Sequence, residues 1–285
     1  MKNASIERLI STDAQVRTPF SGLPLLLKKL ADDEVGFDEL VLTLEQFPSV
    51  TARLLAVANS AWCAPRAPVT SLQSACTQLG LALIRSISIS VAVSAPFDTR
   101  QCPLFDTVRF WYSSLLVAEG AELLAARAEG GAATEPRAVH TVGLLHNIGL
   151  LWLADKLPDY VTRACDMASR GDATSVDDAL RQMIGLGVGG VGSLLLEAWG
   201  LPSLLATAIR HHRDPEYALD GWQSAALLGG AADMVRALRH GLDCPASLPA
   251  LDRLAISSCA RQRVFEKMAQ KSERIQATAN ALACL

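Results

Sequence analysis

The side chains that could carry out chemistry are few in this sequence, and most of them are histidines. They are His140, His146, Asn147, His211, His212 and Asp233. Histidine and aspartate are common ligands of divalent metal ions, but a metal site needs several such donors to converge. A lone histidine on an apolar helix is more often a hydrogen-bonded core residue than a ligand. The residue types therefore leave a metal site and a structural polar cluster both open.

His146 and Asn147 lie inside an almost wholly apolar stretch, GLLHNIGLLWL at positions 143–153. A stretch with so many leucines is expected to be buried, and a buried histidine needs a hydrogen-bond partner. His211 and His212 come directly after a predicted helix, where cationic side chains also suit the negative end of the helix. Only the fold can bring these distant residues together.

The composition favours packed helices over sheets. Half of the residues are hydrophobic (50%), while 19% are charged and 5% are aromatic. Alanine and leucine, which are strong helix formers, make up most of the apolar share. The net charge of −3 and a pI near 6.0 argue against a general polyanion binder. We therefore expect no direct binding of DNA.

The spacing of apolar residues, together with prolines, glycines and capping residues between them, predicts an all-α chain. Alternating strand patterns of any length are missing from the sequence. The predicted helices cover residues 25–36, 37–46, 48–60, 71–80, 81–93, 105–127, a segment that includes His140 and His146, 160–169, 176–184, 192–200, 203–211, 224–239 and 251–282. The glycine-rich run at 185–192 is expected to form a loop.

The cysteines and the N-terminal residues indicate a cytoplasmic protein. Seven cysteines, an odd number without a CxxC pair, suit reduced thiols better than disulfides or a zinc–cysteine site. The first residues, MKNASIERLISTDAQ, carry charges where an export signal needs an apolar core. The apolar runs are also shorter than the ~20 residues of a membrane span. We expect no association with a membrane.

A series of motifs resembles the HD-related output domain (HDOD) family, a branch of the HD superfamily. No single motif is specific, but their order and spacing together are. The resemblance covers roughly residues 18–240 and implies an N-terminal helical lobe followed by an HD-like helical lobe. The motifs are VTARLLAVANS (50–60), SA…LG (74–80), WYSS (111–114), GLLHNIG (143–149), VG (191–192), WGLP (199–202), HH (211–212) and AD (232–233).

The departures from the family pattern concern the metal ligands. Metal-dependent HD phosphohydrolases use a His, a His-Asp pair and a distant Asp. By resemblance, these positions correspond to Ser113, His146, Asn147 and Asp233 here, and a further family histidine falls near Val188. An amide thus replaces the anionic bridge, and a hydroxyl replaces one histidine. The resemblance therefore implies an eroded metal site without a cofactor.

In place of a metal site we expect a neutral hydrogen-bonded network of His146, Asn147, His211 and Asp233. Asn147 suits such a network because its amide both donates and accepts hydrogen bonds. The glycine-rich run would then cover the former metal site.

The resemblance implies a non-catalytic signal-transduction module that binds another signalling protein. Two alternatives stay open. A metal-dependent phosphohydrolase or phosphodiesterase with altered ligands would use His146, His211, His212 and Asp233. A cyclic-dinucleotide sensor without hydrolysis would use Arg210 and Arg213, which flank the histidine pair.

The expected organisation has three parts. Residues 1–97 form the N-terminal helical lobe, residues 98–240 form the HD-like lobe, and residues 241–285 form a C-terminal helical extension. Apolar residues at helical spacing in this extension indicate that it either caps the HD-like lobe or pairs two chains, and we expect packing within the same chain.

Overall fold

The computed structural model describes residues 3–16, 26, 29–30, 35–60, 68–94, 97–128 and 136–283. Every regular element in these ranges is a helix, so the all-α prediction is confirmed. The elements are α1 (Asn3–Val16), α3 (Phe37–Glu45), α4 (Pro48–Ala58), α5 (Leu72–Leu79), α6 (Leu81–Ser94), the 3-10 helix η1 (Thr99–Gln101), α7 (Thr107–Ala125), α8 (Pro136–Leu145), α9 (Ile148–Lys156), α10 (Pro158–Arg170), α11 (Val176–Ile184), α12 (Val188–Ala198), α13 (Ser203–His211), α14 (Trp222–Arg239), α15 (Pro249–Asp252) and α16 (Ser258–Ala283).

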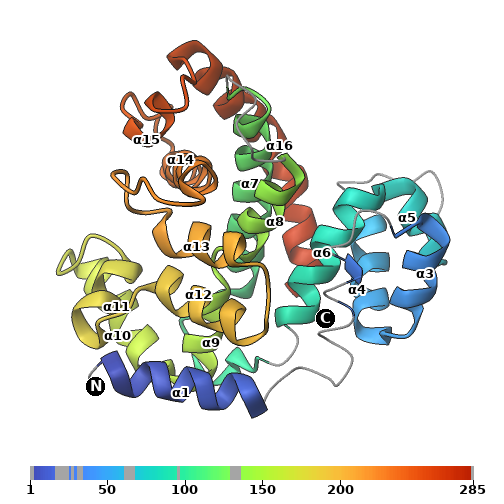
Figure 1. Ribbon diagram of the computed structural model, residues 1–285, viewed down its shortest axis with the longest axis horizontal. Coiled ribbons are helices and arrows are strands. Elements are labelled where there is room, and N and C mark those ends of the chain that lie inside the picture. The colour runs from blue at the N-terminus through green and yellow to red at the C-terminus, as the bar shows by residue number, and fades with distance from the viewer. Residues whose placement is uncertain are drawn as a thin grey trace.

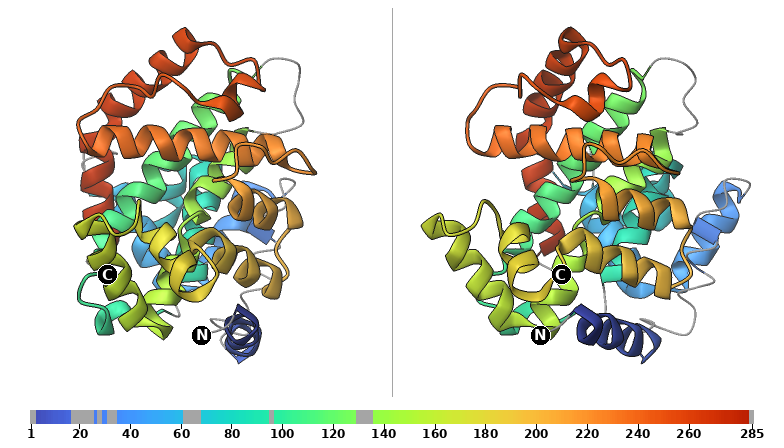
Figure 2. Two further views of the ribbon diagram at one scale, coloured as in Figure 1. Left: turned by 90° about the vertical axis from the view of Figure 1, so that its left-hand side faces the viewer. Right: turned by 60° about the vertical axis from the view of Figure 1, so that its left-hand side comes forward.

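The helices gather in two groups (Figure 1). Helices α3, α4, α5 and α6 contact one another and form the smaller group. The larger group is built on α7, which packs against α8, α14 and α16, while α9, α12 and α13 form a further layer. Figure 2 shows α14 crossing this larger group above α13. Contacts of α6 with α8 and α9 join the two groups.

Both chain ends pack against distant parts of the fold. Helix α1 lies along α12 (Figures 1 and 2) and buries Ile6 and Ile10, which are one turn apart. No helix is predicted for α1 from apolar spacing, because polar residues outnumber apolar ones there. At the other end, α16 packs along α7 and also reaches α4. The predicted packing of the C-terminal segment within the chain is therefore confirmed.

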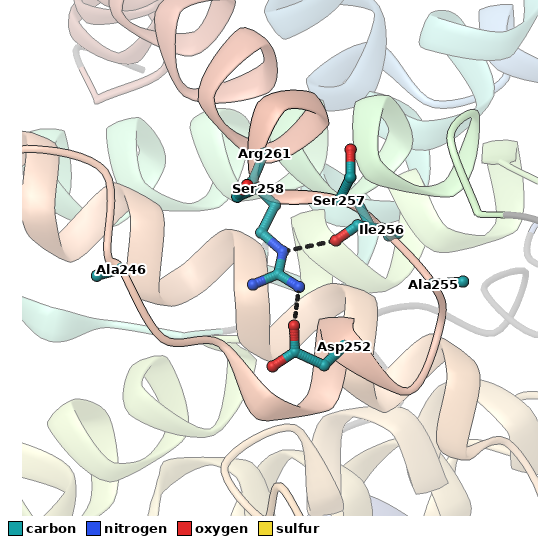
Figure 3. Close-up of a pocket in the computed structure, with 7 residues that line it drawn as sticks. All are labelled: Ala246, Asp252, Ala255, Ile256, Ser257, Ser258 and Arg261. Carbon is teal, nitrogen blue, oxygen red and sulfur yellow. Dashed lines mark hydrogen bonds and ion pairs between the residues drawn. The ribbon is translucent and has the colours of Figure 1, made fainter.

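The C-terminal segment is two helices, so the single helix predicted for 251–282 is wrong at its start. The short α15 ends at Asp252, and α16 begins only at Ser258. Between them Ala255 has φ 55°, a left-handed conformation that breaks a helix. The buried side chain of Arg261 stabilises this turn through its Nε, which donates to the Ile256 carbonyl (2.8 Å), and through an ion pair with Asp252 (Figure 3).

Figure 3 also shows the surface pocket beside this turn, with a volume of about 390 Å³. The guanidinium of Arg261 projects toward it, but the Asp252 carboxylate already neutralises that charge. The remaining lining is Ala246, Ala255, Ile256, Ser257 and Ser258. The pocket is therefore accounted for by the turn that it borders.

The glycine-rich run is mostly helical, and the loop predicted for 185–192 is wrong. Only residues 185–187 form the turn, and α12 begins at Val188. A Cβ atom on Gly149 of α9 would lie 2.2 Å from the Val188 carbonyl oxygen and 2.6 Å from the Gly192 amide nitrogen. The glycines therefore serve a close crossing of α9 and α12. The helix predicted for 25–36 lies mostly outside the described residues.

Gly149→Ala should destabilise the protein, because the added methyl group would push two backbones apart. We expect a loss of about 1–3 kcal/mol in the free energy of unfolding, measured by urea denaturation.

Gly190→Ala is the matched control on α12. Its Cβ would meet only the end of the flexible Leu186 side chain, at 3.2 Å. Helix propensity alone then predicts an unchanged or slightly higher stability. Equal losses in the two variants would contradict the close-crossing argument.

Candidate functional site

His146 occupies the turn between two helices. The predicted helix that includes both His140 and His146 is wrong, because α8 ends at Leu145 and α9 begins at Ile148. The side chain of His146 is buried, and its Nδ1 lies 2.6 Å from the carbonyl oxygen of Gly143. Since a carbonyl can only accept, Nδ1 must carry the proton, which leaves Nε2 of the neutral ring as an acceptor.

His212 repeats this arrangement at the end of α13. Its buried Nδ1 donates to the carbonyl of Ile209 (2.7 Å), again three residues earlier in the chain. The last carbonyls of a helix have no partner within the helix, so each imidazole satisfies one of them. The rings of His146 and His212 lie edge to face, with centroids 6.1 Å apart. The fold thus joins the two histidines as one buried pair.

Both histidines of the pair are neutral at physiological pH. Burial lowers the pKa of His146 to about 3, and the neighbouring His212 and Arg213 act in the same direction. Burial also lowers the pKa of His212 to about 4, again assisted by Arg213. The hydrogen bonds to the two carbonyls oppose these shifts but do not cancel them. A charged imidazole is therefore strongly disfavoured inside this core.

Glycines allow the neighbouring helices to approach His212 closely. A Cβ atom on Gly189 of α12 would lie 3.3 Å from Cε1 of the His212 ring and 2.4 Å from the Ile209 carbonyl oxygen. A Cβ atom on Gly229 of α14 would lie 2.1 Å from the His212 carbonyl oxygen. Helices α12 and α14 thus pack against His212 at the end of α13. The Nε2 atom of His212 has no hydrogen-bond partner among the described residues.

Asp177 is a buried acid beside the pair that sequence reasoning missed. Its Oδ1 accepts from the Val188 amide (2.6 Å) at the start of α12, and its Oδ2 accepts from Arg181 Nε (2.9 Å). Arg213 Nε lies 3.7 Å from Oδ2. Burial alone would raise the pKa of Asp177, but Arg213, Arg181 and the Val188 amide lower it overall. Asp177 therefore holds Arg213 next to His212.

The sequence contained only a partial signal for Asp177. The segment Ser175–Asp178 has the pattern of a helix start, and the Ser175 hydroxyl indeed accepts from the Asp178 amide (3.1 Å). Acidic residues in a first turn are usually solvated and interact with the helix dipole. The burial of Asp177 results from its contact with Val188, eleven positions away, which no local pattern reveals.

The expected hydrogen-bonded network of His146, Asn147, His211 and Asp233 is not formed. The His211 ring stacks on Tyr217, with centroids 3.9 Å apart and planes 7° apart. Asp233 forms an ion pair with Arg236 on the same helix. Neighbouring positions on a helix end point in different directions, so only His212 of the HH motif faces inward.

The other residues implied by the resemblance are also placed apart from a shared network. Within the described residues, neither the Asn147 amide nor the Ser113 hydroxyl makes a side-chain hydrogen bond, and both residues are half-buried. Val188 contributes its backbone amide to Asp177 rather than a metal ligand. His140 lies elsewhere, with Nδ1 2.7 Å from Glu122 Oε2.

The two arginines proposed for nucleotide recognition already have partners. Arg210 donates from Nε to the Ser193 hydroxyl (3.0 Å), and its terminal nitrogen lies 3.4 Å from Glu197. Arg213 lies beside Asp177. An incoming anion would have to compete with these groups.

The donor set does not fit the pair of metal ions that the HD fold implies. The buried pair offers the two Nε2 lone pairs, and histidines that ligate metals do donate their other nitrogen to a carbonyl in this way. However, the described part of the chain contains no group of three His, Cys, Asp or Glu side chains that could hold a metal. The Asp177 carboxylate beside the pair is already engaged by the Val188 amide and two arginines, so it does not offset the charge of two dications.

The fold and the site define an HD-like helical protein in which, of the four expected metal-ligand positions, only His146 belongs to the buried pair. A family model for the HDOD domain matches residues 23–215, and the chain belongs to this family. The recognition made from the sequence motifs is thereby confirmed. Among curated proteins, none matches this chain significantly.

Solved structures with the same fold come from several bacteria. A candidate phosphohydrolase from Shewanella amazonensis SB2B has a TM-score of 0.74 at 23% identity, over 92% of this chain and 93% of its own. A candidate signal transduction protein from Marinobacter aquaeolei VT8 has a TM-score of 0.81 at 21% identity. The match covers 98% of this chain and 66% of that protein. An HDOD domain protein with unknown function from Geobacter sulfurreducens has a TM-score of 0.73 at 22% identity, over 98% and 99% of the chains.

Within the described residues, none of the single helices combines the length and apolar character needed to cross a membrane. Two sharply bent helix pairs pass the same test of length and composition, namely α3 with residues 50–58 of α4, and α11 with α12.

The neutral pair predicts that stability falls in mild acid. The unfolded chain protonates its histidines near pH 6.5, whereas the folded chain resists protonation down to about pH 4 for His212 and about pH 3 for His146. Stability should therefore be complete above pH 6.5 and decline below it, by roughly 2 kcal/mol per histidine between pH 7 and pH 5. Urea denaturation at a series of pH values measures this slope.

The double variant His146→Gln/His212→Gln should flatten the pH dependence, because it removes both groups that resist protonation. His240→Gln is the matched control, since this histidine is exposed and lies outside the pair. A slope that is the same in the wild type and the double variant would show that other groups produce it.

Proposed function

We propose that this protein is a non-catalytic signalling module of the bacterial cytoplasm that acts by binding another signalling protein. Membership of the HDOD family and a neighbour described as a candidate signal transduction protein support the signalling context. The eroded metal site supports the absence of catalysis. In this account the HD-like helices are a scaffold for recognition.

The observation that carries the proposal is the neutral histidine pair. The family's metal chemistry requires anionic ligands around a held ion with an open coordination position. Here Asn147 stands at the position of the bridging aspartate, and Asp233 is turned to Arg236. The remaining buried acid, Asp177, is occupied by the Val188 amide and two arginines. The charges needed for a metal pair are thus absent or already compensated.

One observation favours a metal-dependent phosphohydrolase as the second candidate. The Nε2 atom of His212 is buried without a partner among the described residues, and a single metal ion could use it together with His146. The sensor alternative gains no such support, because both Arg210 and Arg213 are paired. The hydrolase is therefore the rival that an experiment must exclude.

Metal analysis of the protein, purified without a histidine tag and without chelator, distinguishes the two candidates. We expect iron, manganese and zinc far below stoichiometric amounts, and a melting temperature that added metal leaves unchanged. Stoichiometric metal that disappears in His146→Ala would contradict the proposal.

Hydrolysis of a model phosphodiester, with manganese or iron added, provides the functional measurement. We expect the wild type to match the background rate of His146→Ala, because no held metal activates water. His211→Ala controls for histidines outside the pair. Activity present in the wild type and in His211→Ala, but lost in His146→Ala, would establish the hydrolase instead.

A further inference from the structure

A second pocket lies on the surface where α7, α14 and α16 meet, and it shares no residue with the histidine pair. Its volume is about 340 Å³, which lies at the lower end of the range for small-molecule sites. Figures 1 and 2 show these three helices packed together. The pocket is lined by Asp106, Val108, Arg109, Tyr112, Arg239 and Gln276.

Two guanidinium groups line this pocket without forming a direct ion pair among the described residues. Within the described residues, the side chains of Arg109 and Arg239 make no hydrogen bond and no ion pair. Arg236, one turn before Arg239 on the same helix, is by contrast paired with Asp233. The two arginines are 130 positions apart in sequence, so only the packing of α14 against α7 brings them to one pocket.

The two positive charges act on each other. Partial desolvation of the exposed Arg239 side chain lowers its pKa, and Arg109 is the next largest cause in the same direction, while Tyr112 and Asp106 oppose the shift. A guanidinium nevertheless stays protonated in proteins, so both charges persist. An anion bound between them would remove this repulsion.

The other polar side chains of the pocket each make one contact, and that of Gln276 donates from Nε2 to Asn280 Oδ1 (3.3 Å). Asp106 Oδ1 accepts from the Arg109 backbone amide (2.9 Å) and caps the start of α7, so the helix end itself is not the site. The hydroxyl of Tyr112 is 2.7 Å from the Ser272 hydroxyl. The free hydrogen-bond donors of the pocket are therefore those of the two guanidinium groups, which lie in one lining with the second oxygen of Asp106 and the apolar surface of Tyr112 and Val108.

We propose that this pocket binds the phosphate group of a small phosphorylated molecule between Arg109 and Arg239. A planar guanidinium offers paired donors that match phosphate oxygens, and two of them match a phosphate monoester, which carries close to two negative charges. A carboxylate would compensate only one. A small molecule bound in this pocket would regulate the signalling module. The pocket does not depend on whether the histidine pair holds a metal ion, because the two share no residue.

Isothermal titration calorimetry in phosphate-free buffer tests the site with inorganic phosphate, 5′-AMP and adenosine. We expect saturable binding of inorganic phosphate and 5′-AMP, no binding of adenosine, and weaker binding at higher salt. Tighter binding of 5′-AMP than of inorganic phosphate would identify a phosphorylated molecule rather than free phosphate as the ligand. Absence of saturable heat with both phosphate probes would overturn the proposal.

Arg109→Gln and Arg239→Gln should each weaken binding of the phosphate probe by about 10–100-fold, the loss of one charge-assisted contact. Arg263→Gln is the matched control, because Arg263 is exposed on α16 and lies ~20 Å along the helix from Gln276. Binding that survives in both pocket variants, or that falls equally in the control, would contradict the assignment.

Both pocket arginines are exposed, so we expect unchanged melting temperatures in these variants. Arg109→Lys and Arg239→Lys provide a second test that keeps the charge. They should weaken binding less than the glutamine variants, because an ammonium group lacks the paired donors. Metal content and phosphodiester hydrolysis report on the histidine pair alone, so failure of the phosphate site is distinguishable from failure of the proposed function.

Discussion

The buried site depends on one hydrogen bond that occurs twice. In each case an imidazole Nδ1–H, from His146 or His212, donates to the carbonyl three residues earlier at the end of a helix. The bond fixes the tautomer, ends the helix and turns the ring into the core. Because a neutral imidazole can make this bond, the arrangement does not require a charged ring.

The surrounding helices are arranged around this pair. Gly149 lets α9 cross α12 closely, and Gly189 and Gly229 bring α12 and α14 against the backbone and ring of His212. Asp177 joins α11 to the start of α12 and holds Arg213 near both rings. Arg213 in turn lowers the pKa of each histidine, so its positive charge helps to keep both imidazole rings neutral.

Local sequence patterns predicted much of the fold and little of the site. The helices at 176–184 and 203–211 have the predicted bounds, because Ser175 and Pro202 mark their starts. The patterns failed where tertiary contacts determine the local structure. Gly189, Gly190 and Gly192 belong to a closely packed helix and do not form the predicted loop. Likewise the HH motif does not reveal that His212 faces the core while His211 stacks on Tyr217. Contacts between distant segments also bury Asp177 and place Arg109 and Arg239 in the lining of one pocket.

The central claim is that His146 and His212 are neutral, structural residues with the proton on Nδ1. Nuclear magnetic resonance of the imidazole nitrogens, recorded from pH 7 to pH 5 with and without zinc, measures this directly. We expect the Nδ1–H tautomer for both rings across this range, unchanged by zinc. Protonation of either ring near pH 6.5, or a zinc-induced shift at Nε2 of both, would contradict it.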